Sequence, residues 1–291
     1  MTVRLQGKGT PIEIDPCGPN RIIGERINPS GKSRLRRALC DGGWDYVAEE
    51  ARRQVQAGAD VIDVNVGGQG IDEASALPQA VRAVSEAVDV PLCIDTRIPA
   101  ALEAALEVCP GRPLVNSISA ENKVIAEILP IVAEHGLPVI ALCMGQEGIP
   151  PTAAGRLSNA HQALEAAVRA GVMPKDVVFD PLVMTVGADD QAARVALETV
   201  RLLRETFPQN NITGGASNVS FGMPARPVLN AHFLAVASVM GMNIPITDPT
   251  DTDLRFALLA GNMFLGCDQH SRRYMKFYRA TQSKQSHRDG D

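Results

Sequence analysis

Short apolar runs alternate with longer helical patterns along most of this 291-residue chain. Runs such as residues 138–144 are apolar almost without interruption, which indicates strands that are buried on both faces of a parallel sheet. The helical stretches between the runs end at glycines such as Gly58, Gly136 and Gly171, which are favoured stop signals. The pattern predicts eight strands, at residues 21–28, 60–67, 91–97, 114–120, 138–144, 177–183, 212–220 and 245–249.

Consecutive strand–helix units of this kind predict a single-domain α/β protein with the (β/α)8 fold, the TIM barrel. The chain length agrees, because such barrels typically contain about 250 residues. A doubly wound open sheet is the alternative, but it needs a glycine-rich phosphate turn after the first strand, and residues 24–31 lack that spacing. We expect a hairpin extension at residues 1–20 that covers the bottom of the barrel, the barrel itself at 21–279, and a polar, mobile tail at 280–291.

Composition narrows the classes of ligand and location. A net charge of −5 and a pI near 5.6 argue against nucleic acid as the main ligand, since proteins that bind it usually carry a basic face. No apolar run approaches the roughly 20 residues of a membrane span, and the first residues do not resemble a signal peptide. We therefore expect a cytoplasmic protein without membrane contact. The six cysteines show no CxxC spacing and are expected to be reduced.

Polar side chains are concentrated where the predicted strands end. Active sites of (β/α)8 barrels lie at the carboxyl ends of the strands, so these residues are candidates for ligand contact. For any one of them, capping a helix or pairing inside the barrel is an equally good explanation, but the set as a whole needs a ligand or water to satisfy it. The set is Glu25, Arg26, Asn28, Asp63, Asn65, Asp95, Thr96, Arg97, Asn116, Ser117, Ser119, Gln146, Asp180, Asn218, Ser220 and Asp248.

The residue types missing from these strand ends also restrict the chemistry. No histidine falls on a predicted strand end, which argues against a histidine metal site or a histidine general base. No lysine lies within a predicted strand, so Schiff-base chemistry has no nucleophile there. Carboxylates alone could bind magnesium, but the amide content suits a neutral polar heterocycle better, and no intrinsic metal is expected.

The segment 214–226 is the densest polar stretch of this kind. It follows an apolar strand pattern with a run of small, amide and hydroxyl residues, centred on Asn218. A carboxamide donates and accepts hydrogen bonds at once, which suits a ring whose nitrogens alternate between the two roles. The segment is therefore expected to present polar groups to a ligand.

Several of these motifs, taken in order, resemble those of the pterin-binding methyltransferases. The resemblance is greatest to the free-standing methyltetrahydrofolate:corrinoid protein methyltransferases, and it covers about residues 20–278. The segments that carry it are Ile22-Ile-Gly-Glu-Arg-Ile-Asn28, Ile62-Asp-Val-Asn-Val-Gly-Gly68, Cys93-Ile-Asp-Thr96, Val115-Asn-Ser-Ile-Ser119, Phe179-Asp-Pro-Leu182 and Ser217-Asn-Val-Ser-Phe-Gly222.

The resemblance implies a (β/α)8 barrel that is usually homodimeric and moves a methyl group between N5 of tetrahydrofolate and the cobalt of a corrinoid carried by a separate protein. It implies that the pterin ring hydrogen-bonds to Asp95, Asn116 and Asp180, and that Asn218 is the catalytic residue that reaches N5. The same cavity would be lined, less specifically, by Asp63, Asn65 and Arg226.

Three alternatives stay open at this point. A dihydropteroate synthase shares some elements, but it would carry a lysine after Phe179-Asp-Pro, Ser-Arg-Lys at 217–219 and Arg-x-His near the eighth strand, none of which is present. A non-catalytic subunit that stores or delivers folate, or an unrelated barrel lyase, would also fit the fold. The similar module of methionine synthase belongs to a much longer chain. Residues 1–20 and 31–37 depart from the acetogen pattern, which leaves the corrinoid partner unidentified.

Overall fold

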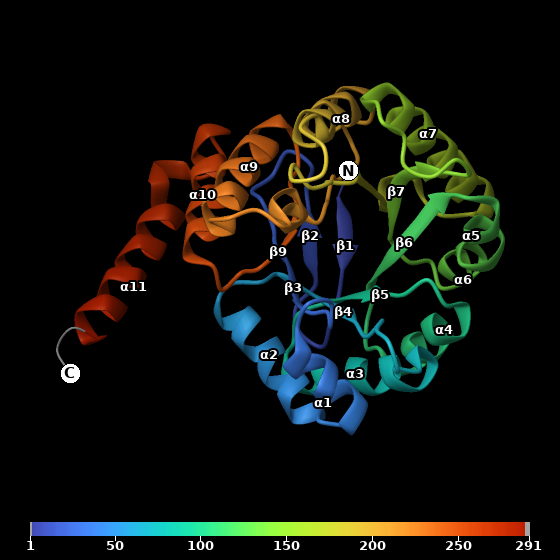
Figure 1. Ribbon diagram of the computed structural model, residues 1–291, viewed down its shortest axis with the longest axis horizontal. Helices are drawn as coiled ribbons and strands as arrows, with labels where there is room; N and C mark the ends of the chain where they lie inside the picture. The colour runs from blue at the N-terminus through green and yellow to red at the C-terminus, as the bar shows by residue number, and fades with distance from the viewer. Residues whose placement is uncertain (1, 289–291) are drawn as a thin grey trace.

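The computed structural model describes residues 2–288, which form one α/β domain built on a curled parallel sheet (Figure 1). The order of the sheet is β8-β7-β6-β5-β4-β3-β9, so each strand pairs with its neighbour in the chain and β9 returns to β3. The strands are β3 (Ile23–Ile27), β4 (Val61–Asn65), β5 (Leu92–Asp95), β6 (Leu114–Ala120), β7 (Val139–Gly145), β8 (Val177–Asp180) and β9 (Ile246–Thr247).

Helices cover the outside of this sheet, as expected when every strand is followed by a crossover helix. They are α1 (Ser33–Asp41), α2 (Trp44–Gln56), α3 (Glu73–Ala87), α4 (Pro99–Val108), α5 (Asn122–Glu127), α6 (Leu129–Glu134), α7 (Ala153–Ala170), α8 (Ala192–Thr206), α9 (Arg226–Met240), α10 (Thr252–Phe264) and α11 (Arg272–Arg288). Short 3₁₀ turns lie at η1 (Pro174–Asp176), η2 (Ala216–Ser220) and η3 (Gln269–Ser271).

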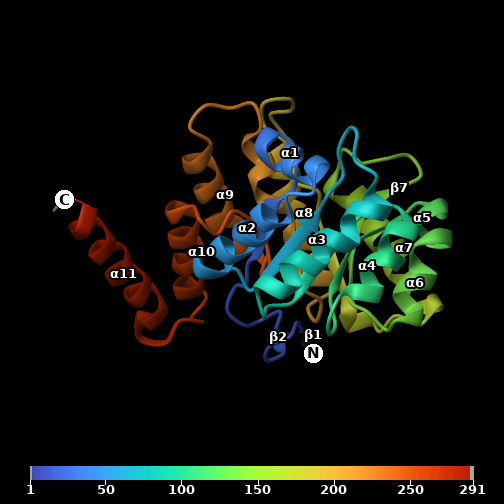
Figure 2. The ribbon, with the colours of Figure 1, turned by 90° about the horizontal axis from the view of Figure 1, so that it is seen from below.

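The predicted N-terminal hairpin is present as β1 (Val3–Leu5) paired antiparallel with β2 (Ile12–Ile14). It lies at the end of the sheet opposite to α1 (Figure 2). Three of its side chains, Val3, Leu5 and Ile14, pack in one buried cluster with residues near the starts of the strands. The strand residues of this cluster are Ile23, Val61, Cys93, Leu114, Ile140, Val178 and, just before β9, Ile244. The hairpin thus closes the amino-terminal end of the sheet, which leaves the carboxyl end as the face that can receive a ligand.

The predicted seventh strand, 212–220, is wrong as a strand. Residues 216–220 form η2, and residues 211–214 are an extended connection between β8 and β9. The backbone N–H of Thr213 donates to Phe179 O at 2.8 Å, and that of Ile246 donates to Gly214 O at 3.0 Å. Two successive glycines, Gly214 and Gly215, explain why no regular strand forms here, because glycine weakens a strand.

The C-terminal segment, predicted as a polar tail from residue 280, is helical where the structure describes it. Helix α11 continues to Arg288 without a break at residue 280, whereas residues 289–291 lie outside the described part of the chain. The reason lies at the start of the helix, where Tyr274 and Phe277 pack against Phe256 of α10 and anchor a stretch without glycine or proline. Beyond this contact α11 projects from the rest of the domain (Figures 1 and 2).

Two further expectations concern cysteines and membranes. All six cysteines are free, and Cys93 and Cys143 are buried in strands. Within residues 2–288, no helix is both long and apolar enough to cross a bilayer.

Candidate active site

Four of the residues predicted for the site come together as one cluster across three neighbouring strands. The register places Asn65 of β4 beside Asp95 of β5, and Asp95 beside Asn116 of β6. Asn65 Nδ2 donates to Asp95 Oδ2 at 2.8 Å, and Asn116 Nδ2 reaches Asp63 Oδ1 at 3.4 Å. Adjacent parallel strands therefore present two carboxylates and two amides at one end of the sheet.

Burial sets the electrostatics of this cluster. Desolvation raises the pKa of Asp95 to about 6, although the hydrogen bond from Asn65 lowers it and the charge of Glu73 raises it. Burial raises the pKa of Asp63 well above its ordinary value, and the neighbouring Asp95 carboxylate adds to the effect. The two carboxylates are thus costly to ionise, and a ligand that brings N–H donors would stabilise their charged forms.

Asp180 occupies the end of β8 and is held by a turn that follows it. The N–H of Leu182 donates to Asp180 Oδ1 at 2.7 Å, and burial raises the pKa of Asp180 to about 6 against this bond and the charge of Arg156. A Cβ atom built on Gly214 would lie 3.5 Å from Asp180 Oδ1. Asp180 therefore faces the segment that leads to Asn218. Within the described chain, no hydrogen bond joins Asp180 to the four-residue cluster.

Arg156 of α7 fixes this turn, and the sequence analysis did not identify it. Its side chain is buried, and Nη1 donates to the carbonyls of Pro181 and Leu182 at 2.8 and 2.7 Å, while Nε donates to Pro150 O at 3.0 Å. Leu182 has a positive φ of 64°, which a leucine adopts rarely. Arg156 thus holds the backbone next to Asp180 in an otherwise unfavourable conformation.

We expect Arg156→Met to lower the free energy of unfolding by about 3 kcal/mol, because buried carbonyl oxygens lose their donor. Urea unfolding followed by circular dichroism would measure it. Arg169→Met on the same helix is the control, since Arg169 is exposed and its ion pair with Glu165, at 3.7 Å, is exposed as well. Equal stability of the Arg156 and Arg169 variants would contradict the assignment of Arg156 as a clamp on this turn.

Asn218 lies on η2 with its side chain exposed. No hydrogen bond to its carboxamide is found among the described residues, so the group is free to meet a ligand. A Cβ on Gly215 would approach Asn218 Nδ2 to 2.8 Å, closer than such atoms come in proteins. Glycine at 215 is therefore required for the observed position of the amide.

Arg226 fastens the turn that carries Asn218. Nη2 donates to Ser217 O at 3.0 Å and Nε donates to Ser220 Oγ at 3.1 Å, so the bonds fall on either side of Asn218. Ser220 Oγ in turn donates to Asn230 Oδ1 at 2.6 Å. Arg226 is exposed and contacts the loop that carries Asn218; its place among the residues that line the ligand site stays a prediction.

Sequence reasoning named Glu25 among the strand-end candidates but assigned it no role in the site. Glu25 is on β3, and its Oε2 accepts a hydrogen bond of 2.8 Å from Ser217 Oγ. Burial raises the pKa of Glu25. The nearby Lys32 donates to the backbone carbonyls of Glu25 and Arg26, each at 3.2 Å. The carboxyl end of β3 therefore belongs to the same face as the Asn218 turn.

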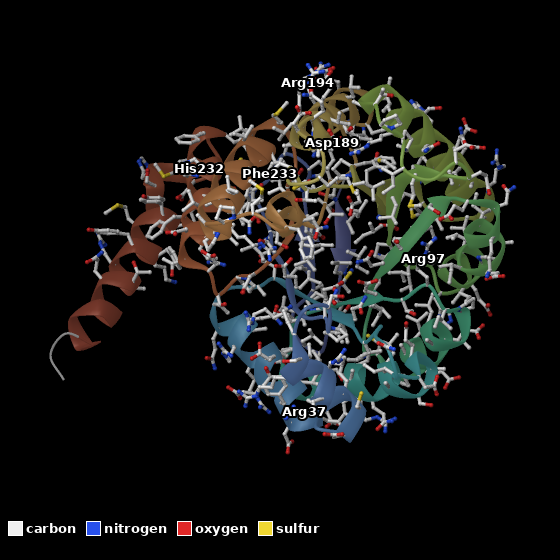
Figure 3. All side chains as sticks on the ribbon, in the orientation of Figure 1. Arg37, Arg97, Asp189, Arg194, His232 and Phe233 are labelled. Atoms are coloured by element: carbon white, nitrogen blue, oxygen red, sulfur yellow. The ribbon has the colours of Figure 1, made fainter. Side chains whose placement is uncertain are left out.

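The rim of this face carries charged side chains. Arg97 follows β5 and pairs with Glu121 at 2.5 Å, and Glu121 also accepts from Ser119 Oγ at 2.8 Å. Figure 3 labels Arg97 beside the ends of β5 and β6, and Asp189 in the loop after β8. Across residues 2–288, no group of three or more His, Cys, Asp or Glu side chains is placed to hold a metal ion.

A cleft of about 570 Å³ lies elsewhere, between α2, α10 and α11, and is lined by residues such as Arg21, Arg255 and Phe277. None of the predicted site residues lines it. The geometry of the strand ends, rather than cavity size, therefore identifies the candidate site.

Comparisons with known proteins identify the relatives of this chain. The family model described as pterin binding enzyme matches residues 24–248. A methylcorrinoid:tetrahydrofolate methyltransferase of Eubacterium limosum is 32% identical over 260 residues, which are 89% of this chain and 96% of the relative. The methionine synthase of Mycobacterium tuberculosis is 29% identical over 237 residues, which are 77% of this chain but 20% of that longer protein.

Solved structures of similar fold include dihydropteroate synthases. One from Yersinia pestis, with a pterine-sulfa conjugate, has a TM-score of 0.68 at 18% identity and covers 91% of this chain and 99% of its own. One from Xanthomonas albilineans, with 4-aminobenzoic acid, has a TM-score of 0.67 at 16% identity, over 91% and 98% of the two chains. At these identities the likeness concerns the fold alone. The family match and the methyltransferase relative together establish that this chain belongs to the pterin-binding enzyme family.

Proposed function

We propose that this protein is a methyltransferase that moves a methyl group between N5 of tetrahydrofolate and the cobalt of a corrinoid held by a separate protein. One observation carries the proposal beyond pterin binding. The carboxamide of Asn218 is exposed and without a hydrogen bond in the described chain, yet the turn that bears it is fastened on both sides by Arg226. A protein that only stores folate needs no such group at N5. The name of the Eubacterium limosum relative supports the same reaction.

The pterin ring would be held by the buried carboxylates and amides. The amino-pyrimidine edge of a pterin offers N–H donors, which match Asp95 and Asp180, while Asn116 can donate and accept in turn. Asp63 and Asn65 contact Asn116 and Asp95, so their part is to orient these two side chains. Arg226 would orient Asn218 through the turn. This arrangement would leave N5 toward Asn218 at the open end of the sheet.

The reaction is a displacement at the methyl carbon. In one direction the N5 lone pair forms the new N–C bond, the electron pair of the Co–C bond stays on cobalt as Co(I), and N5 loses its proton. In the other direction N5 must gain a proton or a strong hydrogen bond, because a tertiary amine is a poor leaving group. Asn218 can supply the hydrogen bond but not the proton, so its contribution is electrostatic stabilisation of the changing charge at N5. The rest of the catalysis is orientation of the two reactants.

The same reasoning disfavours dihydropteroate synthase activity. The likeness to those enzymes is one of fold, and the chain lacks the lysine and the Ser-Arg-Lys segment expected of them, with Asn218 in the corresponding place.

The fold belongs to the proposal as well. We propose that residues 212–215 take the position of the seventh strand in a (β/α)8 barrel. The support is that the backbone of this segment bonds to β8 on one side and to β9 on the other. A barrel closed in this way places the ends of β3, β4, β5, β6 and β8 around one opening. Cytoplasmic localisation and the absence of an intrinsic metal stay predictions.

A direct assay tests the function. The protein would be mixed with methylcob(III)alamin and tetrahydrofolate, and formation of Co(I) would be followed by absorbance while methyltetrahydrofolate is quantified. We expect stoichiometric methyl transfer that depends on the protein. Folate binding without transfer to or from any corrinoid would favour the carrier, and no folate binding at all would favour an unrelated lyase.

We also propose a homodimer formed through α10 and α11. The end of α10 and the adjoining α11 expose large apolar side chains, namely Phe264, Leu265, Met275 and Tyr278. Helix α11 contacts the domain mainly at its start and then projects away from it (Figure 2). Apolar side chains gathered on a projecting helix are typical of an interface, and we assign the second copy of this chain as the occupant.

We expect Phe264→Glu to convert the dimer to a monomer, because a charged side chain would be buried at the centre of the contact. Sedimentation velocity would measure the change. Phe221→Glu is the control, since Phe221 is exposed to a similar extent (68%, against 72% for Phe264) but lies at the end of η2, outside α10 and α11. A wild-type protein that sediments as a monomer would contradict the interface.

A further inference from the structure

Glu25 is a buried carboxylate joined to the turn that carries Asn218. Its Oε2 accepts the Ser217 hydroxyl hydrogen at 2.8 Å, and Ser217 is the residue before Asn218 on η2. The two residues are 192 positions apart in the chain, so the contact exists only because the fold brings β3 beside η2. The Glu25 carboxylate and the Ser217 hydroxyl are thus hydrogen-bonded to each other, next to Asn218, the residue proposed to contact N5.

The charged groups around Glu25 do not form an ion pair with its carboxylate within residues 2–288. Lys32 directs its ammonium to the backbone carbonyls of Glu25 and Arg26. Asp248 is paired with Arg26 at 2.7 Å, and Arg226 is engaged with the turn. Burial raises the pKa of Glu25; the hydrogen bond from Ser217 and the charges of Lys32 and Arg226 lower it, and the charge of Asp248 raises it. A glutamate in this setting exchanges a proton closer to neutral pH than an exposed one does.

The other carboxylates at this face accept hydrogen bonds from groups outside the turn that carries Asn218. Asp95 accepts from Asn65, Asp180 accepts from the Leu182 N–H, and Glu73 accepts from Thr96 Oγ1 at 2.8 Å. Asp63 lies deeper, with Asn116. Of these carboxylates, only Glu25 is hydrogen-bonded to the turn that bears Asn218.

We propose that Glu25 and Ser217 form the proton relay for N5, which deepens the proposed function and rests on it. When N5 of tetrahydrofolate takes the methyl group, its proton passes to the Ser217 hydroxyl while the Ser217 proton passes to Glu25. The N5–C bond forms, the Co–C bond breaks with its electron pair left on cobalt, and Glu25 ends protonated. In the reverse direction the same path returns the proton to N5 as the methyl group leaves. Asn218 stabilises the charge at N5, and Glu25 supplies or removes the proton.

The test is the pH profile of a single turnover with tetrahydrofolate and methylcob(III)alamin. Glu25→Gln should slow transfer by at least about tenfold at neutral pH and remove one ionisation from the profile, with folate affinity nearly unchanged. Ser217→Ala should have a similar effect, Ser217→Thr should restore the rate because it keeps the hydroxyl, and the double variant should lose no more than either single one. The matched control is Glu13→Gln, which alters another hydroxyl–glutamate pair, with Thr2 at 3.2 Å, in the hairpin at the opposite end of the sheet.

The outcomes separate the relay from the function. If the unmutated protein transfers methyl and Glu25→Gln does so with the same rate and pH profile, the proposed relay is wrong but the proposed methyltransferase function is still supported. If the unmutated protein transfers nothing, both are wrong. Should Glu25→Gln fail to fold by circular dichroism, the Ser217 variants decide, since equal rates for the alanine and threonine variants would overturn the relay.

Discussion

Replacing Asn218 with alanine should slow single-turnover methyl transfer by about 10²-fold or more, while the dissociation constant for methyltetrahydrofolate changes much less. The carboxamide has no partner to lose in the described protein, so its removal leaves the fold and the ground state largely intact. In the proposed reaction its hydrogen bond to N5 would strengthen as charge develops there, and loss of such a contact typically costs about 3 kcal/mol of transition-state stabilisation. Rapid mixing that follows cobalt absorbance, beside equilibrium binding, measures both quantities.

The control for this variant is Asn122→Ala. Asn122 is also an exposed asparagine in the part of the chain that the structure describes, but it lies at the start of α5 rather than on η2. We expect it to transfer methyl at the wild-type rate. Equal losses in rate and binding for Asn218→Ala would reduce Asn218 to a residue that only positions the ring.

The second large effect concerns Asp180, which we expect to control folate affinity. Asp180→Asn should weaken methyltetrahydrofolate binding by about 1–3 kcal/mol, because an amide N–H would face the N–H donors of the pterin. Isothermal titration calorimetry measures the change. Asp189→Asn is the control in the same loop, since Asp189 is exposed and accepts from the Gln191 N–H (Figure 3). Wild-type affinity in Asp180→Asn would remove this carboxylate from the pterin site.

We also expect Asp180 to make folate binding depend on pH. Burial raises its pKa to about 6, and the pterin donors favour the ionised form, so binding should tighten as the pH rises from 5 to 7, by about tenfold for this group. Asp180→Asn should remove this increment. The pH dependence of stability in the ligand-free protein has the opposite sign. Asp180 binds its proton more tightly in the folded protein than in the unfolded chain, so its contribution to the free energy of unfolding declines between about pH 4 and 6.

The sequence was sufficient to predict the parallel sheet, the hairpin and the position of the carboxylate cluster. Asp63, Asn65, Asp95 and Asn116 each fall near the end of an apolar run, and neighbouring parallel strands bring such residues together. The spacing of apolar residues along the chain shows where each strand ends, and this spacing is a local feature of the sequence. No knowledge of distant contacts was needed to expect these side chains at one face.

The remaining features depend on contacts that no local pattern contains. Arg156 lies in an ordinary helical stretch, and its role appears only when α7 packs beside the turn after β8. Glu25 was visible as a strand-end residue, but its hydrogen bond to Ser217 joins residues 192 positions apart in the chain. The strand predicted at 212–220 failed because apolar residues were given more weight than the two glycines that follow Thr213.

The hairpin at the amino-terminal end has a consequence for the order of events in turnover. Since β1 and β2 seal that end, folate and the corrinoid must use the same opening. A corrinoid protein that docks there would cover the bound pterin as well. Folate would then have to bind before the corrinoid protein docks, and the folate product would leave only after the corrinoid protein has dissociated. Substrate binding and product release would therefore follow a compulsory order rather than a random one.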